Sequence, residues 1–152
     1  MKLSVITINL NNKEGLKRTV TSVLTQTIYP TIEYLVIDGQ SNDGSLEIIE
    51  QHADRISYWT SEQDNGVYDA MNKGSLRASG KYLLFLNSGD ILADSSALER
   101  AVHELDGTDI IYGDICFDYG THRERYLYPD QLSFRFFCER SLGHPATFIR
   151  RE

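Results

Sequence analysis

Residues 81–86 read Lys81-Tyr82-Leu83-Leu84-Phe85-Leu86, the most apolar run in the chain. A short apolar run without polar alternation is typical of a strand that is buried on both faces, as at the centre of a parallel sheet. The polar residues Asn87-Ser88-Gly89-Asp90 follow directly. The sequence therefore predicts a central strand whose carboxyl end carries short polar side chains.

On both sides of this run, short β-branched segments alternate with helical patterns. We expect further strands over residues 3–8, 34–37, 56–60, 109–117 and 145–149, and helices over residues 14–26, 45–52, 67–77 and 95–105. Alternation of this kind predicts an α/β fold: a mostly parallel central sheet with helices on both faces, in a Rossmann-like arrangement.

Length and composition limit the possible functions. A chain of 152 residues with 41% hydrophobic residues suits one globular domain. Acidic residues outnumber basic ones by 22 to 15, which gives a net charge of -7. Because nucleic-acid binding needs Lys and Arg facing phosphates, we expect no nucleic-acid partner. The net charge does not exclude a small basic pocket that binds a diphosphate.

No segment predicts a leader or a membrane span. The apolar segment Leu3–Ile8 is too short for a signal sequence, and no stretch approaches the roughly 20 apolar residues of a membrane helix. Cys116 and Cys138 form no metal-binding pattern, so we expect buried free thiols. These features predict a cytoplasmic protein.

Short polar residues follow each of the first four predicted strands. They are Asn9, Asn11 and Asn12, then Asp38–Gly44, then Ser61–Gly66, then Asn87–Asp90. Turns use the same residue types, so any one loop taken alone predicts only a turn. Parallel strands place their carboxyl ends at one edge of a sheet, where ligands bind. Four such loops together therefore favour a ligand site at that edge.

Asp38 follows Leu35-Val36-Ile37 at the carboxyl end of the second predicted strand. Its carboxylate could accept a hydrogen bond from a nucleotide base or a ribose hydroxyl, or it could cap the next turn through Ser41. Motifs of rival nucleotide folds are missing: neither GxGxxG nor GxxxxGK[ST] occurs. No acidic pair follows the first strand, which disfavours a phospho-acceptor domain.

The chain contains four characteristic blocks, which cover residues 5–11, 36–45, 64–74 and 80–90. In this order they resemble the family 2 inverting glycosyltransferases, especially those that build bacterial surface polysaccharides. The joint spacing of the blocks makes the resemblance specific. It implies an A-type glycosyltransferase fold and a role in polysaccharide biosynthesis. It also implies a donor half over residues 1–117 and the start of an acceptor half over residues 118–152.

The resemblance implies transfer of a sugar, of hexosyl type, from a nucleoside-diphosphate sugar to a saccharide or a lipid-linked acceptor. A lipid-linked acceptor would be met at the inner face of the membrane, with peripheral membrane contact. An inverting enzyme needs a base for the acceptor hydroxyl. In the family this base follows a strand like residues 145–149, so we expect it beyond residue 152. The alternative is a non-catalytic nucleotide-sugar-binding module or an inactive partner subunit.

By the same resemblance, the donor site gathers residues from all four blocks. The residue matching Asp38 contacts the base, the loop from Ile8 to Asn11 lies under the ribose, and the helix with Asn72 and Lys73 lines the pocket. For Lys73, a solvated surface lysine is an equal alternative. The predicted donor-binding residues are Ile8, Asn9, Asn11, Asp38, Gly39, Ser41, Asp64, Gly66, Asn72, Lys73, Asn87 and Gly89.

The fourth block is implied to hold a divalent metal, Mn²⁺ or Mg²⁺, against the diphosphate. A hard cation with oxygen ligands neutralises the charge that develops on the leaving group. The family has Asp-x-Asp here, whereas this chain has Asn87-Ser88-Gly89-Asp90. The predicted metal ligand is therefore Asp90 alone, with a turn or cap role as the alternative.

The C-terminal quarter is less regular. Aromatic and arginine side chains alternate between Tyr126 and Arg140, which predicts core packing or acceptor-site lining in preference to a membrane or partner surface. His144 precedes the last strand and could touch the diphosphate or the acceptor, although a structural role is the more common one for a loop histidine.

Overall fold

The computed structural model describes residues 2–151. Its main sheet has six strands in the order β3-β2-β1-β4-β8-β5. Their bounds are β3 (Tyr58–Ser61), β2 (Glu33–Asp38), β1 (Leu3–Asn9), β4 (Tyr82–Phe85), β8 (Thr147–Arg150) and β5 (Ile110–Tyr112). The pairs β3-β2, β2-β1 and β1-β4 are parallel, and β8 runs antiparallel to both of its neighbours. The predicted mostly parallel sheet with β4 near its centre is confirmed.

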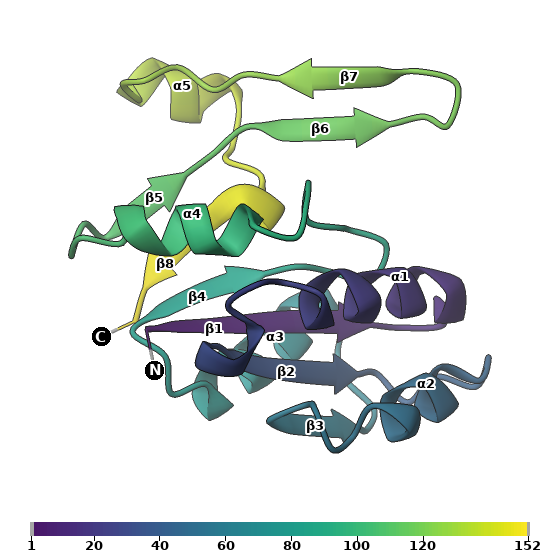
Figure 1. Cartoon of the computed structure of the whole chain (residues 1–152). Helices are drawn as coiled ribbons and strands as arrows, with labels where there is room; N and C mark the ends of the chain where they lie inside the picture. Colours follow the sequence, from purple (N-terminus) through teal and green to yellow (C-terminus); the bar gives the residue numbers. More distant parts are fainter. Residues whose placement is uncertain (1, 152) are drawn as a thin grey trace.

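Helices cover both faces of this sheet (Figure 1). Helices α1 (Lys13–Leu24), α2 (Ser45–Gln51) and α4 (Ala97–Glu104) pack on one face, and α3 (Val67–Arg77) packs on the other. Successive side chains of a strand point to opposite faces. Val5 thus joins the cluster under α1, and Ile6 joins the cluster under α3. The α/β class predicted from the alternation is confirmed.

Register places the ends of the parallel strands side by side. Asn9, the last residue of β1, is aligned with Asp38 at the end of β2, and Asp38 is aligned with Ser61 at the end of β3. The backbone N–H of Ser88, just after β4, donates to the carbonyl of Ile8 at 3.0 Å. The four polar loops therefore meet at one edge of the sheet, as predicted.

A second layer differs from the prediction. The strand predicted over residues 109–117 is two strands, β5 and β6 (Ile115–Asp118), because the chain turns away at Gly113 and Asp114. Strand β6 pairs antiparallel with β7 (Arg123–Tyr126) in a separate two-stranded sheet. Figure 1 shows this hairpin beside α5 (Phe134–Glu139), away from the main sheet. Two short 3-10 turns, Tyr29–Thr31 and His144–Ala146, complete the elements.

One prediction about this layer is wrong, and one of the two alternatives offered for the aromatic residues fails. Cys116 and Cys138 are free, but both are exposed, since they lie on β6 and α5 and not in the main core. Core packing fails for Phe134 and Phe137, whose side chains are 86% and 54% exposed. A two-stranded sheet with one short helix has no opposite layer that would cover them.

None of the helices within residues 2–151 has the length and hydropathy that a membrane crossing requires.

Candidate functional site

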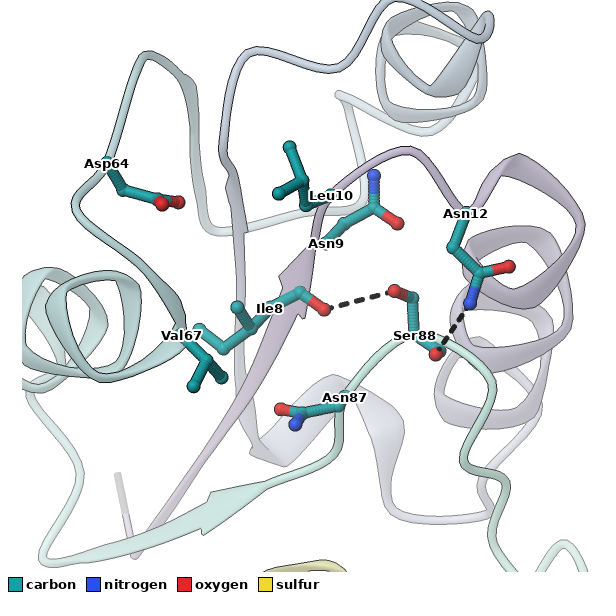
Figure 2. A pocket seen from close by; sticks show the side chains of 8 residues that line it. All are labelled: Ile8, Asn9, Leu10, Asn12, Asp64, Val67, Asn87 and Ser88. Carbon is teal, nitrogen blue, oxygen red and sulfur yellow. Dashed lines mark hydrogen bonds between the residues drawn. The ribbon is translucent and has the colours of Figure 1, made fainter.

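An open pocket of about 280 Å³ lies at the carboxyl ends of β1 and β4. Figure 2 shows its lining: side chains from the β1 end, the start of α1, the loop after β3, the first turn of α3 and the loop after β4. These residues are Ile8, Asn9, Leu10, Asn12, Asp64, Val67, Asn87 and Ser88. Apolar and amide side chains dominate the wall, which suits a ligand with a flat ring and several hydrogen-bonding groups.

Asp38 is fully buried behind this wall. Its Oδ1 accepts hydrogen bonds from Asn9 Nδ2 at 2.7 Å and from Ser41 Oγ at 2.6 Å. Its Oδ2 accepts from Ser41 N at 2.9 Å and from Ser61 Oγ at 2.6 Å. Asp38 therefore caps the turn at Ser41, which was the alternative role expected from the sequence. The carboxylate thus joins the ends of three neighbouring strands.

Asn9 stands between Asp38 and the pocket. Its side chain is 99% buried, and Nδ2 also donates to Ser41 Oγ at 3.1 Å. Among residues 2–151, no group donates to Asn9 Oδ1, and the same holds for Asn87 Oδ1. Burying an amide oxygen without a partner is unfavourable, so the pocket wall carries two unmet hydrogen-bond acceptors.

The loop after β4 is fixed by α1. Thr19, buried on α1, accepts from Gly89 N at 2.9 Å and lies 2.8 Å from the Asp90 carbonyl. Asn12 caps α1 by accepting from Gly15 N, and its Nδ2 donates to the Ser88 carbonyl at 2.9 Å. Gly89 has φ of +110°, which few other residues adopt. These contacts hold the backbone of the loop Asn87–Asp90, the predicted metal site, against α1.

Asp64 lies across the pocket from this loop (Figure 2). Its Oδ1 accepts from Gly66 N at 2.9 Å, within the turn that begins α3. Its Oδ2 approaches Gly39 so closely that a Cβ there would lie 2.6 Å away. A side chain at position 39 would therefore displace the Asp64 carboxylate from its place beside the loop after β2.

Eight of the twelve predicted donor residues do not line the pocket. Five of them belong to the strand ends and loops around it: Asp38, Gly39, Ser41, Gly66 and Gly89. The other three are Asn11, Asn72 and Lys73. Asn11, with φ of +48°, is exposed and ties the first loop to Ser41 and Asn42. Asn72 is exposed on α3. Lys73 donates to the Gln63 carbonyl and pairs with Glu62 at 3.1 Å. Desolvation lowers the pKa of Lys73, but the hydrogen bond and charge of Glu62, with the charges of Asp69 and Asp64, outweigh this effect and raise it.

Asp90 follows the lining residues Asn87 and Ser88 by two positions and has a half-exposed carboxylate, and His144 Nε2 lies 3.7 Å from its Oδ2. Within residues 2–151, no three His, Cys, Asp or Glu side chains gather as a metal site would require. One carboxylate is nevertheless a donor set that Mg²⁺ and Mn²⁺ use when substrate phosphates and water supply the other ligands. The residues present fit a cation held jointly with a diphosphate.

The sequence matches the family described as Glycosyl transferase family 2 over residues 4–150.

The chain belongs to this family.

Curated relatives within it include an uncharacterised glycosyltransferase of Mycobacterium tuberculosis, 44% identical over 69% of this chain and 40% of its own length. A PGL/p-HBAD biosynthesis glycosyltransferase of the same species is 32% identical over 97% of this chain and 59% of its own length. The chain therefore spans about half the length of the relatives it matches.

Solved structures of similar fold show the same architecture. One is Staphylococcus aureus TarS, residues 1–349, in complex with UDP-GlcNAc, with a TM-score of 0.68, 23% identity and coverage of 76% of this chain and 34% of that one. Another is the mannosyltransferase PcManGT of Pyrobaculum calidifontis with GDP-Man and Mn²⁺, with a TM-score of 0.67, 18% identity and coverage of 74% and 35%. The predicted A-type glycosyltransferase fold is confirmed.

Four lining residues were not among the predicted site residues: Leu10, Asn12, Val67 and Ser88. Asn12 could have been found, because an Asn before a helical pattern is a cap signal. Ser88 lies between two predicted residues. Leu10 lies within the loop from Ile8 to Asn11 that the resemblance places under the ribose. Val67 gives no polar signal, and only the meeting of the first loop with the start of α3 reveals it.

Proposed function

We propose that this pocket binds a nucleoside-diphosphate sugar and that the protein transfers the sugar, with inversion, to a saccharide or lipid-linked acceptor in polysaccharide synthesis. The observation that carries the proposal is the convergence of the polar ends of β1, β3 and β4 on one pocket, with Asp38 at the end of β2 bonded to the lining residue Asn9, in a chain of glycosyl transferase family 2. Relatives with UDP-GlcNAc and GDP-Man support a nucleotide-sugar donor.

The lining supports a division of the pocket. Ile8, Leu10 and Val67 offer apolar surface for the nucleoside, close to the carboxylate of Asp64. Asn87 and Ser88 line the same pocket, and we propose that the loop from Asn87 to Asp90 meets the diphosphate. Asp38, Gly39, Ser41 and Gly66 support these contacts by fixing the loops. We propose that Asn11, Asn72 and Lys73 contact the donor only from the rim of the site.

A divalent cation, Mn²⁺ or Mg²⁺, would be held by Asp90 together with the diphosphate, with His144 beside it. When bound, it would neutralise the charge that develops on the leaving diphosphate. Asp90 and its loop supply orientation, because Thr19 fixes the backbone on either side of it.

We propose residues 1–117 as the donor half and residues 118–152 as the beginning of the acceptor half. The hairpin β6-β7 and α5 support this division, since they form a layer apart from the main sheet. Inversion needs a base for the acceptor hydroxyl, and we assign that role to none of residues 2–151.

A second candidate function is nucleotide-sugar binding without transfer. It is favoured by Asn87, which stands where the resemblance expects an Asp. Losing that carboxylate weakens cation binding, and a weak cation site would slow departure of the diphosphate.

Calorimetric titration of the chain with UDP and GDP, each with and without Mn²⁺, tests the proposal. We expect one of them to bind, and to bind more tightly with Mn²⁺. Asp90→Ala should abolish the Mn²⁺ effect and leave the metal-free affinity nearly unchanged. Asp54→Ala, an exposed carboxylate away from the pocket, is the matched control. Failure of both nucleotides to bind would overturn the proposal.

A further inference from the structure

The buried carboxylate of Asp38 has no free hydrogen-bonding position facing the pocket. Both of its oxygens accept two hydrogen bonds from the chain, and its side chain is fully buried. Asp38 is also not part of the pocket lining. A ligand that bonded directly to Asp38 would have to displace one of these donors.

Asn9 is the residue between Asp38 and the pocket, and its amide has a fixed orientation. Nδ2 donates to Asp38 Oδ1 at 2.7 Å, and a carboxylate cannot donate in return. The amide oxygen must therefore point to the other side. That oxygen has no donor among residues 2–151, and Asn9 lines the pocket (Figure 2).

We propose that Asn9 Oδ1 is the atom that accepts the nucleoside's hydrogen bond, and that Asp38 acts through Asn9 as a positioning residue. This inference rests on the proposed function and names the group that recognises its donor. The ligand group must be an N–H or O–H donor, because the oxygen can only accept. A uracil or guanine ring N–H and a ribose hydroxyl share this chemistry.

Asn9 Oδ1 is shielded from solvent in the described chain, so ligand entry must open the wall beside it. We place this opening at Leu10, the next residue along the chain, which lines the pocket and is 57% exposed. The amide of Asn9 keeps its orientation during this opening, because its Nδ2 stays bonded to Asp38 and Ser41.

Analogues that lack one donor group identify the group that Asn9 binds. The probes are UDP, 3-methyl-UDP and 2′-deoxy-UDP, and in parallel GDP, 1-methyl-GDP and 2′-deoxy-GDP. For the wild-type chain we expect one analogue of the binding nucleotide to lose about tenfold or more in affinity, the usual effect of one unmet buried acceptor. Asn9→Ala should bind that nucleotide and that analogue equally.

Asp38→Asn separates the indirect role from direct contact. An amide at position 38 still offers an oxygen to Asn9 Nδ2, so the variant should keep the preference for the unmodified nucleotide while its overall affinity falls severalfold. If Asp38→Asn loses the preference and Asn9→Ala keeps it, the nucleoside is bound by Asp38 and the inference is overturned.

A wild-type measurement avoids the risk that these variants do not fold. The side-chain amide NMR signals of Asn9 should shift on saturation with the binding nucleotide, and should shift much less with the discriminating analogue. Unchanged Asn9 signals at saturation would overturn the inference. Failure of wild-type chain to bind UDP and GDP would instead overturn the proposed function, so the two failures are distinguishable.

Discussion

At the scale of single residues, one buried hydroxyl fixes the loop that is proposed to meet the diphosphate. Thr19 is fully buried on α1 and contacts Gly89 N and the Asp90 carbonyl after β4. Helical spacing predicts that the α1 face packs inward, but it gives no partner for a threonine on that face. The contact joins residues about 70 positions apart and depends on the fold.

Thr19→Val should lower the free energy of unfolding by about 1–3 kcal/mol, because the shape is kept while buried hydrogen-bonding groups lose their partner. Urea denaturation measures the change. Thr21→Val is the matched control, since that exposed hydroxyl bonds only within α1 to the Lys17 carbonyl and should change stability by less than about 0.5 kcal/mol. Equal effects of the two substitutions would contradict a loop-fixing role.

At the scale of elements, α3 approaches the sheet closely because of one glycine. A Cβ at Gly74 would lie 2.6 Å from Ile6 Cγ2 on β1 and 3.4 Å from Ile37 Cγ1 on β2. This approach brings α3 close to β1 and β2, and Val67 in the first turn of α3 lines the pocket. The helical pattern predicts α3, but not its distance from β1.

Gly74→Ala should lower the free energy of unfolding by about 1–3 kcal/mol through overpacking. The gain of roughly 1 kcal/mol that alanine gives in a helix reduces this loss without reversing it. Differential scanning calorimetry measures it, with Leu76→Ala on the exposed side of α3 as the control. A higher melting temperature for Gly74→Ala would show that α3 has room to shift.

Glu33 joins three elements at the opposite edge of the sheet. Its carboxylate, at the start of β2, accepts from Ser4 Oγ on β1 and from Ser79 N and Oγ before β4. Partial burial raises the pKa of this carboxyl, but the hydrogen bonds from Ser4 and Ser79 outweigh that effect and hold it below 4.5.

A lowered folded-state pKa stabilises the native state above the unfolded value of 4.5, and this contribution is lost as the pH falls through the folded value. The stability difference between wild type and Glu33→Gln should therefore be constant from roughly pH 6 to 8 and shrink below about pH 4.5. Urea unfolding across this range measures it, with Glu50→Gln as an exposed control. A difference that grew at low pH would contradict the assignment.

At the scale of the whole molecule, the chain consists of a buried sheet and a thin outer layer. Strands β1, β2 and β4 are almost entirely buried, whereas β6, β7 and α5 contain no buried residue. Regions with few buried apolar contacts open at lower free energy than the core. The two layers should therefore differ in local stability.

Amide hydrogen exchange should be slowest in β1, β2 and β4 and faster by orders of magnitude in β6 and β7. Exchange followed by mass spectrometry on the native chain measures this order. Adding the binding nucleotide should slow exchange at residues 8–12 and 87–90, the two segments that contribute most of the pocket lining, and leave β6-β7 unchanged. Uniform protection across both layers would contradict this division.

The sequence by itself determined the α/β class, the parallel strands and the edge at which the polar loops meet, because these follow from local periodicity and from the rule that parallel strands end on one side. It also carried the family resemblance. The tertiary structure alone decided that Asp38 is enclosed while Asn9 faces the pocket, that Asn72 lies outside it, and that Val67 belongs to its wall. Such outcomes depend on which distant side chains meet and how closely the helices approach the sheet. No local pattern encodes those distances.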